Sequence, residues 1–237
     1  MAGVTNGPAA DATLAIVALD RPTMRDALAI VEQLGDGCRF YKIGSELFTR
    51  EGPRVVDAVR ATGADVFLDL KFHDIPNTVR ESARAAAASG VRLLTVHASG
   101  GAEMVGAAVD GAGSGCGVLA VTVLTSLDSA SLGAAWGRES VLVEHEVLRL
   151  AGIAAAAGAH GVVCSGHEVA AVRAAYPELA PLVPGIRLPG GAAHDQSRVS
   201  TPADAARAGA RYLVLGRAVT AAPDMAAAMA AVAGALH

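Results

Sequence analysis

The chain has 237 residues, of which 52% are hydrophobic and 3% aromatic, and its 19 basic and 23 acidic side chains give a net charge of −4. This composition argues against a disordered chain and, because no basic stripe is present, against a nucleic-acid binder. Three cysteines without CxxC spacing favour reduced thiols in a cytoplasmic protein. No apolar run is long enough to span a bilayer. We expect residues 1–12 to form a flexible tail and residues 13–237 to form one catalytic domain.

Short runs of Val, Leu and Ile alternate along the chain with Ala-rich helical stretches such as 78–88 and 142–157. Strands are predicted, in chain order, over residues 14–19, 40–43, 66–70, 93–96, 118–124, 161–164, 182–183 and 212–215. Strands that alternate with helices indicate βαβ units and a parallel sheet. Eight strands in a chain of this length favour a closed (β/α)8 TIM barrel, with a doubly wound open sheet as the alternative.

Polar or charged side chains close nearly every predicted strand. In chain order they are Asp20, Lys42, Asp69 with Lys71, His97, Thr125 with Ser126, Ser165, Pro184 with Arg187, and Gly216 with Arg217. Active sites of (β/α)8 barrels lie at the carboxyl ends of the strands. We therefore expect these side chains to meet at one face of the barrel.

Asp69 and Lys71 lie two residues apart at the end of the third predicted strand. Because strands have a period of two, both side chains are expected to point into the barrel and to pair. Lys42 closes the neighbouring strand and is placed to reach the same carboxylate. Such a charge network is common in catalytic sites, but a structural ion pair at the rim of the barrel explains an isolated Asp-x-Lys equally simply.

His73 and Asp74, which follow Lys71, each have a simple structural interpretation. Asp74 precedes Ile75 and Pro76, a pattern that predicts Asp74 as the N-cap of a helix with proline in its first turn. His73 is typical of a loop or packing residue. Because the sequence has no H-x-x-H, H-E-x-x-H or cysteine cluster, we expect no protein-bound metal.

A phosphate site is predicted after the eighth strand, where Gly216 and Arg217 open a helix. Glycine lets the backbone approach an anion, and an arginine offers two parallel N–H donors. Residues 184–199 have no clear period and are predicted to form a long loop, which is expected to be functional or mobile. Its Arg187, Gln196 and Arg198 are further candidate donors.

The run FLDLKFHDIPNTV at residues 67–79 resembles the signature of the orotidine 5′-phosphate decarboxylase family. Other segments agree with the family in the same order, so the resemblance spans about residues 13–235. These segments are ALD at 18–20, YKIG at 41–44, VHA at 96–98, LTS at 124–126, PGIR at 184–187, DQ at 195–196 and VLGR at 214–217.

The resemblance implies a (β/α)8 barrel, a homodimer with active sites at the subunit interface, and no cofactor. It also implies decarboxylation of orotidine 5′-phosphate (OMP) to uridine 5′-phosphate (UMP), the last step of de novo UMP synthesis. Carried over residue by residue, Lys71 is the proton donor and Asp69 lies beside the substrate carboxylate. Lys42 completes the charged row, and Asp74 and Thr78 are lent by the other subunit.

The same resemblance assigns the remaining contacts with the substrate. Asp20 and Lys42 contact the ribose, and either Thr125 or its neighbour Ser126 contacts the pyrimidine. The phosphate is held by Gln196, Gly216 and Arg217, with Arg187 close by, and Ile75 completes the expected substrate-binding set.

Two other functions remain open. Decarboxylases and aldolases of hexulose or gulonate 6-phosphates share the Asp-x-Lys-x-x-Asp pattern, but they use a metal ion and an enediolate intermediate. His73 and the IPNT tail at 75–78 fit the orotidine family better. The second alternative is a non-catalytic barrel that binds a phosphorylated ligand. The intact set of Asp69, Lys71 and Asp74 argues against it, since a degenerate relative would more readily have lost one member.

Overall fold

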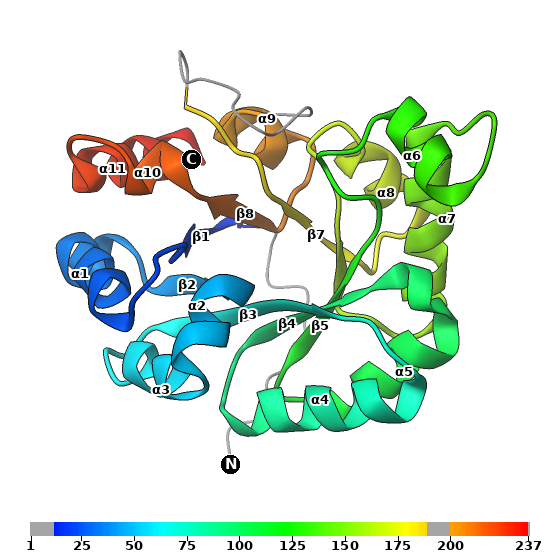
Figure 1. Ribbon diagram of the computed structural model, residues 1–237. Coiled ribbons are helices and arrows are strands. Elements are labelled where there is room, and N and C mark those ends of the chain that lie inside the picture. Colours follow the sequence, from blue (N-terminus) through cyan, green and yellow to red (C-terminus); the bar gives the residue numbers. More distant parts are fainter. Residues whose placement is uncertain (1–11, 189–199, 237) are drawn as a thin grey trace.

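The structure, a computed structural model, describes residues 12–188 and 200–236. Within these residues, parallel strands close into a barrel in sequence order, from β1 to β8 (Figure 1). The strands are β1 (Leu14–Ala18), β2 (Phe40–Gly44), β3 (Asp65–Phe72), β4 (Leu93–His97), β5 (Gly117–Val121), β6 (Gly161–Val163), β7 (Ala180–Val183) and β8 (Tyr212–Leu215). Because β1 pairs with both β2 and β8, the sheet is closed. The predicted barrel is confirmed, and the open sheet is excluded.

Helices lie outside the barrel and cover its strands (Figure 1). They are α1 (Met24–Leu34), α2 (Ser45–Glu51), α3 (Arg54–Arg60), α4 (Pro76–Ala88), α5 (Gly101–Ala112), α6 (Ser129–Trp136), α7 (Val143–Ala156), α8 (Val169–Ala175), α9 (Pro202–Arg207), α10 (Arg217–Thr220) and α11 (Met225–Ala235). The predicted helices at 78–88 and 142–157 correspond to α4 and α7. Pro76 stands at the first position of α4, where its missing N–H is not needed. No helix in the described part of the chain is long and apolar enough to cross a membrane.

Alternate side chains of the strands fill the barrel, while the others pack against the helices. The filling side chains are Ile16, Ala18, Phe40, Phe67, Leu93, Leu119, Leu182, Tyr212 and Val214. Toward the carboxyl ends of the strands, the same inward positions become polar. Lys42 follows Phe40 by two residues, and Asp69 follows Phe67 by two residues. The barrel thus has an apolar interior that ends in charged groups at one face.

The fifth strand ends earlier than its apolar run predicts. Strand β5 stops at Val121, whereas residues 118–124 are apolar enough to suggest a longer strand. Both the backbone N–H and the hydroxyl of Thr122 donate to the carbonyl of Val163, at 3.2 and 2.7 Å. These bonds tie the chain to β6 as it leaves β5. Leu124 and Thr125 therefore lie in a loop above the barrel interior.

Candidate active site

A cavity of about 570 Å³ opens at the carboxyl ends of the strands. Its floor is the apolar interior of the barrel, including Phe67, Val163 and Val214. Its polar lining includes Asp20, Lys42, Asp69, Lys71, Thr125, Ser126, Arg187, Gly216 and Arg217, all of which the sequence singles out. The expectation that the polar strand ends meet at one face is confirmed for these residues, whereas His97 and Ser165, which it also includes, do not line the cavity.

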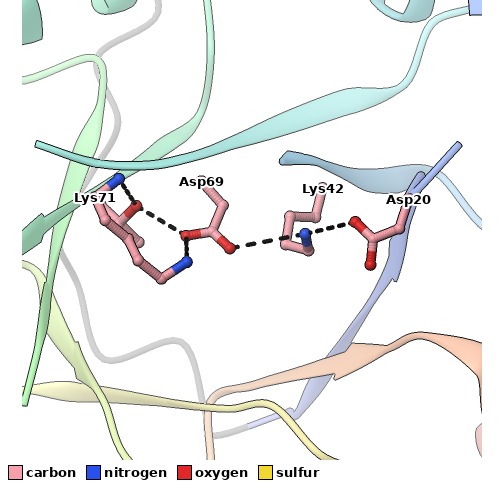
Figure 2. A network of polar contacts seen from close by, with 5 residues as sticks. Asp20, Lys42, Asp69 and Lys71 are labelled. Atoms are coloured by element: carbon pink, nitrogen blue, oxygen red, sulfur yellow. Dashed lines mark hydrogen bonds and ion pairs between the residues drawn. The ribbon is translucent and has the colours of Figure 1, made fainter. Parts of the chain in front are cut away.

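Four charged side chains of alternating sign form a row along one wall of this cavity (Figure 2). The ammonium of Lys71 donates to Asp69 Oδ1 at 2.7 Å, and Lys42 Nζ lies 3.7 Å from Asp69 Oδ2. Lys42 also donates to Asp20 Oδ1 at 2.9 Å. The side chains of Lys42 and Asp69 are only 11% and 14% exposed. Because water solvates these charges poorly, each charge is stabilised mainly by the other.

Burial acts to raise the pKa of the Asp69 carboxyl, because it penalises the charged form. The positive charges of Lys42 and Lys71 outweigh burial, with help from hydrogen bonds of Lys71 and Thr95. The pKa of Asp69 therefore lies below its ordinary value of 3.8. Asp69 is a carboxylate at neutral pH, fixed beside the ammonium of Lys71.

Thr95 is a member of this site that sequence reasoning missed. Its side chain is buried on β4, where its hydroxyl accepts from the backbone N–H of Lys71 at 2.9 Å and donates to Asp69 Oδ1 at 3.0 Å. Thr95 therefore fixes both the backbone of Lys71 and the carboxylate of Asp69. The available signal was its inward position, two residues before His97 on the same strand.

Lys71 has a backbone conformation that strand periodicity does not predict. Its φ of +54° is the one positive φ of a non-glycine residue in ranges 12–188 and 200–236. The register between β3 and β4 also shifts between Leu68 and Phe72. Such a conformation costs about 1–2 kcal/mol, and residues held in this way cluster at active sites. The predicted pairing with Asp69 is confirmed, but it arises from an irregular strand end.

The prediction that Asp74 caps α4 is wrong. Ile75 is the residue before Pro76, its backbone is extended, and no side chain caps the helix. Proline disfavours a helical conformation of the residue before it, which places Asp74 one position too early to be the cap. Instead, Asp74 Oδ1 accepts from the N–H of Ile75 at 2.7 Å. Asp74, Ile75 and Thr78 are exposed and do not line the cavity of their own chain.

The predicted phosphate donors after β7 and β8 line the same cavity. Gly216 immediately precedes α10, whose first residue is Arg217, and Arg187 follows β7. Gln196 and Arg198 lie outside the described residues. Arg21 also lines the cavity and donates to the carbonyl of Thr220 at 2.8 Å. Sequence reasoning missed Arg21, because a single arginine after Asp20 carries no pattern.

No three His, Cys, Asp or Glu side chains are grouped to hold a metal ion among the residues that the structure describes. The histidines nearest to Lys71 contact each other instead, since the ring centroids of His73 and His97 are 5.4 Å apart. Burial lowers the pKa of His97 below its ordinary value of 6.5, and the charges of His73 and Lys71 lower it further, against Asp69.

Lowering the pH is expected to reduce the stability of the fold through His97. Well above pH 6.5 the imidazole is neutral in both the folded and the unfolded chain. As the pH falls through 6.5, His97 binds a proton in the unfolded chain but stays neutral in the folded chain. The free energy of unfolding therefore decreases until the pH reaches the lower pKa of folded His97. Urea denaturation of the wild-type protein and His97→Gln between pH 8 and pH 5 (about 0.5-unit steps) measures this slope. An identical slope in the variant would contradict the assignment.

The geometry of the site agrees with comparisons to known proteins. Residues 13–232 match the family model described as "Orotidine 5'-phosphate decarboxylase / HUMPS family".

The chain belongs to this family.

Among its relatives, the orotidine 5′-phosphate decarboxylase of Anaeromyxobacter sp. (strain K) is 56% identical over 92% of this chain and 96% of the relative. The enzyme of that name from Halorhodospira halophila is 48% identical over 92% of this chain and 93% of its own length. The crystal structure of orotidine 5′-phosphate decarboxylase from Lactobacillus acidophilus superposes with a TM-score of 0.84 at 37% identity, covering 95% of this chain and 99% of that one. Members of the family thus share both the fold and most of the length of this chain.

Proposed function

We propose that this chain decarboxylates OMP to UMP and CO2, as a cytoplasmic enzyme of the last step of de novo UMP synthesis. The observation that carries the proposal is the row of Lys71, Asp69, Lys42 and Asp20 along a cavity that arginines also line. The relatives named orotidine 5′-phosphate decarboxylase, at up to 56% identity, support the same substrate. Family membership alone does not decide this, since the family model also covers the HUMPS branch.

The proposed chemistry needs a cation at a fixed place. When the bond between C6 and the carboxylate breaks, its electron pair stays on C6 in an orbital perpendicular to the ring π system. The ring therefore offers no ordinary electron sink, and a preplaced ammonium stabilises the developing charge. Lys71 supplies this ammonium, then transfers a proton from Nζ to C6 and becomes a neutral amine, which solvent reprotonates.

The other members of the row position the substrate and Lys71. Asp69 accepts a hydrogen bond from the side chain of Lys71, and Thr95 accepts one from its backbone N–H. Asp69 also lies beside the substrate carboxylate, where like charges make the bound ground state less favourable and loss of CO2 relieves the repulsion. Asp20 and Lys42 bind the ribose hydroxyls, and Thr125 or Ser126 binds the edge of the pyrimidine.

The phosphate lies far from C6, so its binding contributes positioning energy rather than chemistry. We assign it to Gly216, Arg217 and Arg187, together with Gln196 beyond the described residues. Arg187, after β7, and Arg217, after β8, line the same cavity as the charged row. In this proposal the two negatively charged ends of the substrate contact different cationic groups.

A homodimer completes the proposed site. Asp74, Ile75 and Thr78 follow Lys71 closely but do not line the cavity of their own chain, and Ile75 is 67% exposed. An apolar side chain between exposed polar ones suits a contact surface. In this proposal these three residues enter the cavity of the partner subunit, with Asp74 beside the partner's copy of the row.

The deciding experiment mixes purified protein with OMP in excess EDTA and follows the loss of orotate absorbance, with UMP confirmed by chromatography. Turnover that EDTA leaves unchanged supports the proposal. The alternative, a metal-dependent decarboxylase or aldolase acting on hexulose or gulonate 6-phosphates, requires that activity stop with the chelator. Absence of any change with OMP would contradict the proposed function.

Arg217→Ala is expected to raise KM for OMP by ~30-fold or more, since truncating one partner of a charge-assisted contact costs roughly 2–4 kcal/mol. Initial rates over a range of OMP concentrations measure the change. Arg25→Ala is the matched control, because the side chain of Arg25 is 92% exposed and lies outside the cavity. A KM equal to that of the control would remove Arg217 from the phosphate site.

A further inference from the structure

The turn after β6 holds a buried polar group that the proposed mechanism does not use. Ser165 is 0% exposed and Glu168 is 5% exposed. The backbone N–H and the hydroxyl of Ser165 both donate to Glu168 Oε2, at 2.8 and 2.6 Å. The N–H of His167 donates in turn to the Ser165 hydroxyl at 3.3 Å. Residues 165–168, called here the support turn, are therefore locked by hydrogen bonds that water does not reach.

Gly166, within the support turn, lies directly against a residue from the other end of the long loop. A Cβ on Gly166 would lie 2.6 Å from the Cβ of Ser200 and 2.7 Å from its hydroxyl oxygen. The φ of Gly166 is not positive, so its backbone conformation does not require glycine. What requires glycine here is space, because Ser200 occupies the place where a side chain would project.

Ser200 in turn holds the segment that carries Arg187. Ile186 and Ser200 form a parallel β-bridge, in which the N–H of Arg187 donates to the carbonyl of Ser200 at 2.9 Å. Ile186 is fully buried, and Arg187 lines the cavity. Short contacts thus connect Gly166 to Ser200 and Ser200 to Arg187.

We propose that the support turn is a positioning element that sets Arg187 at the phosphate end of the cavity through the contact between Gly166 and Ser200. The inference rests on the proposed function, because Arg187 is assigned there to the substrate phosphate. A group added at Gly166 must displace Ser200 rather than the turn, since the bonds between Ser165 and Glu168 hold the turn in place. Gly166, Ser165 and Glu168 act on the ligand only through Arg187.

The test compares Gly166→Ala with a double variant in which a second substitution, Ser200→Gly, should reverse the effect of the first. Gly166→Ala is expected to raise the calorimetric Kd for UMP and KM for OMP by about tenfold, the usual scale of one overpacked methyl group. The value of kcat at saturating OMP stays within about threefold of wild type, because the row that contains Lys71 is not displaced. In Gly166→Ala/Ser200→Gly, the two atoms that lie within 3 Å of the added methyl group are gone, so Kd and KM return toward wild type.

Gly106→Ala in α5 is the matched control, because a Cβ on Gly106 meets nothing within 4 Å. Ser165→Ala removes the hydroxyl from Glu168 without adding volume and should raise the Kd for UMP about threefold, as expected for one lost buried hydrogen bond. If Gly166→Ala does not fold, the Kd of Ser165→Ala for UMP tests the proposal instead.

An unchanged Kd in both Gly166→Ala and Ser165→Ala overturns the inference, as does a rise that Ser200→Gly fails to reverse. A wild-type protein that does not convert OMP contradicts the proposed function instead, so the two failures are distinguishable.

Discussion

Lys71→Ala is expected to lower kcat/KM for OMP by on the order of 10⁵-fold, since it removes both a preplaced charge and a general acid, each of which contributes several powers of ten. Binding of UMP should persist, because the proposed ribose and phosphate contacts involve other residues of the cavity. Absorbance assays at high enzyme concentration measure the residual rate, and calorimetry with UMP shows that the cavity remains formed.

Lys71→Arg separates the two roles of the lysine. Its guanidinium keeps the positive charge but holds its protons too tightly to deliver one at neutral pH. We expect this variant to remain severely impaired. Turnover near the wild-type rate in either variant would contradict the assignment of Lys71 as proton donor, and an intact fold by circular dichroism excludes unfolding as the cause of a loss.

Mixing two inactive variants is expected to restore activity, because the proposed site draws on two subunits. Lys71→Ala lacks the proton donor of its own cavity, and Asp74→Ala lacks the carboxylate that it lends to its partner. In a mixed dimer, one cavity carries both defects and the other carries neither. If subunits reassort randomly, about half of the dimers are mixed, so about a quarter of all cavities are complete.

The measurement needs each variant alone, and then the two after joint unfolding and refolding. Each alone should be almost inactive, and the refolded mixture should reach about a quarter of the wild-type rate. A matched mixture of Lys71→Ala with Asp69→Ala should stay inactive, since both defects affect the subunit's own cavity and no complete one forms. If the first mixture also stays inactive, Asp74 does not act across an interface.

The sequence predicts the barrel and most of the site because both depend on periodic features. Apolar runs repeat at the spacing of βα units, and inward positions at the strand ends are polar, as in Lys42 and Asp69. An error of one residue in a predicted strand boundary still leaves the end of the strand at the face where the carboxyl ends of the strands meet. The fifth strand was overestimated because Val123 and Leu124 are as apolar as the strand before them.

Local geometry at Lys71 lay beyond sequence reasoning for a physical reason. Lys71 has a positive φ, and its N–H donates to the hydroxyl of Thr95, which belongs to the neighbouring strand. A threonine in a strand is common and gives no sign of such a contact. The role of Asp74 was equally open, since an exposed carboxylate before a proline fits a helix cap, a solvent contact or a subunit interface.

The charged row has a further consequence for the chemical reactivity of the protein. Lys42 and Lys71 are the two lysines of the sequence, and every other member of its 19 basic residues is an arginine. Both lysine amines line the same cavity, so an amine-selective reagent finds no other side chain to modify. Lys71, with a side chain 36% exposed, is more accessible than Lys42 at 11%. Apart from reaction at the α-amino group of the N-terminus, acylation or reductive alkylation of this protein is therefore chemistry on its candidate active site. Immobilisation through lysine amines would block the cavity it is meant to leave open.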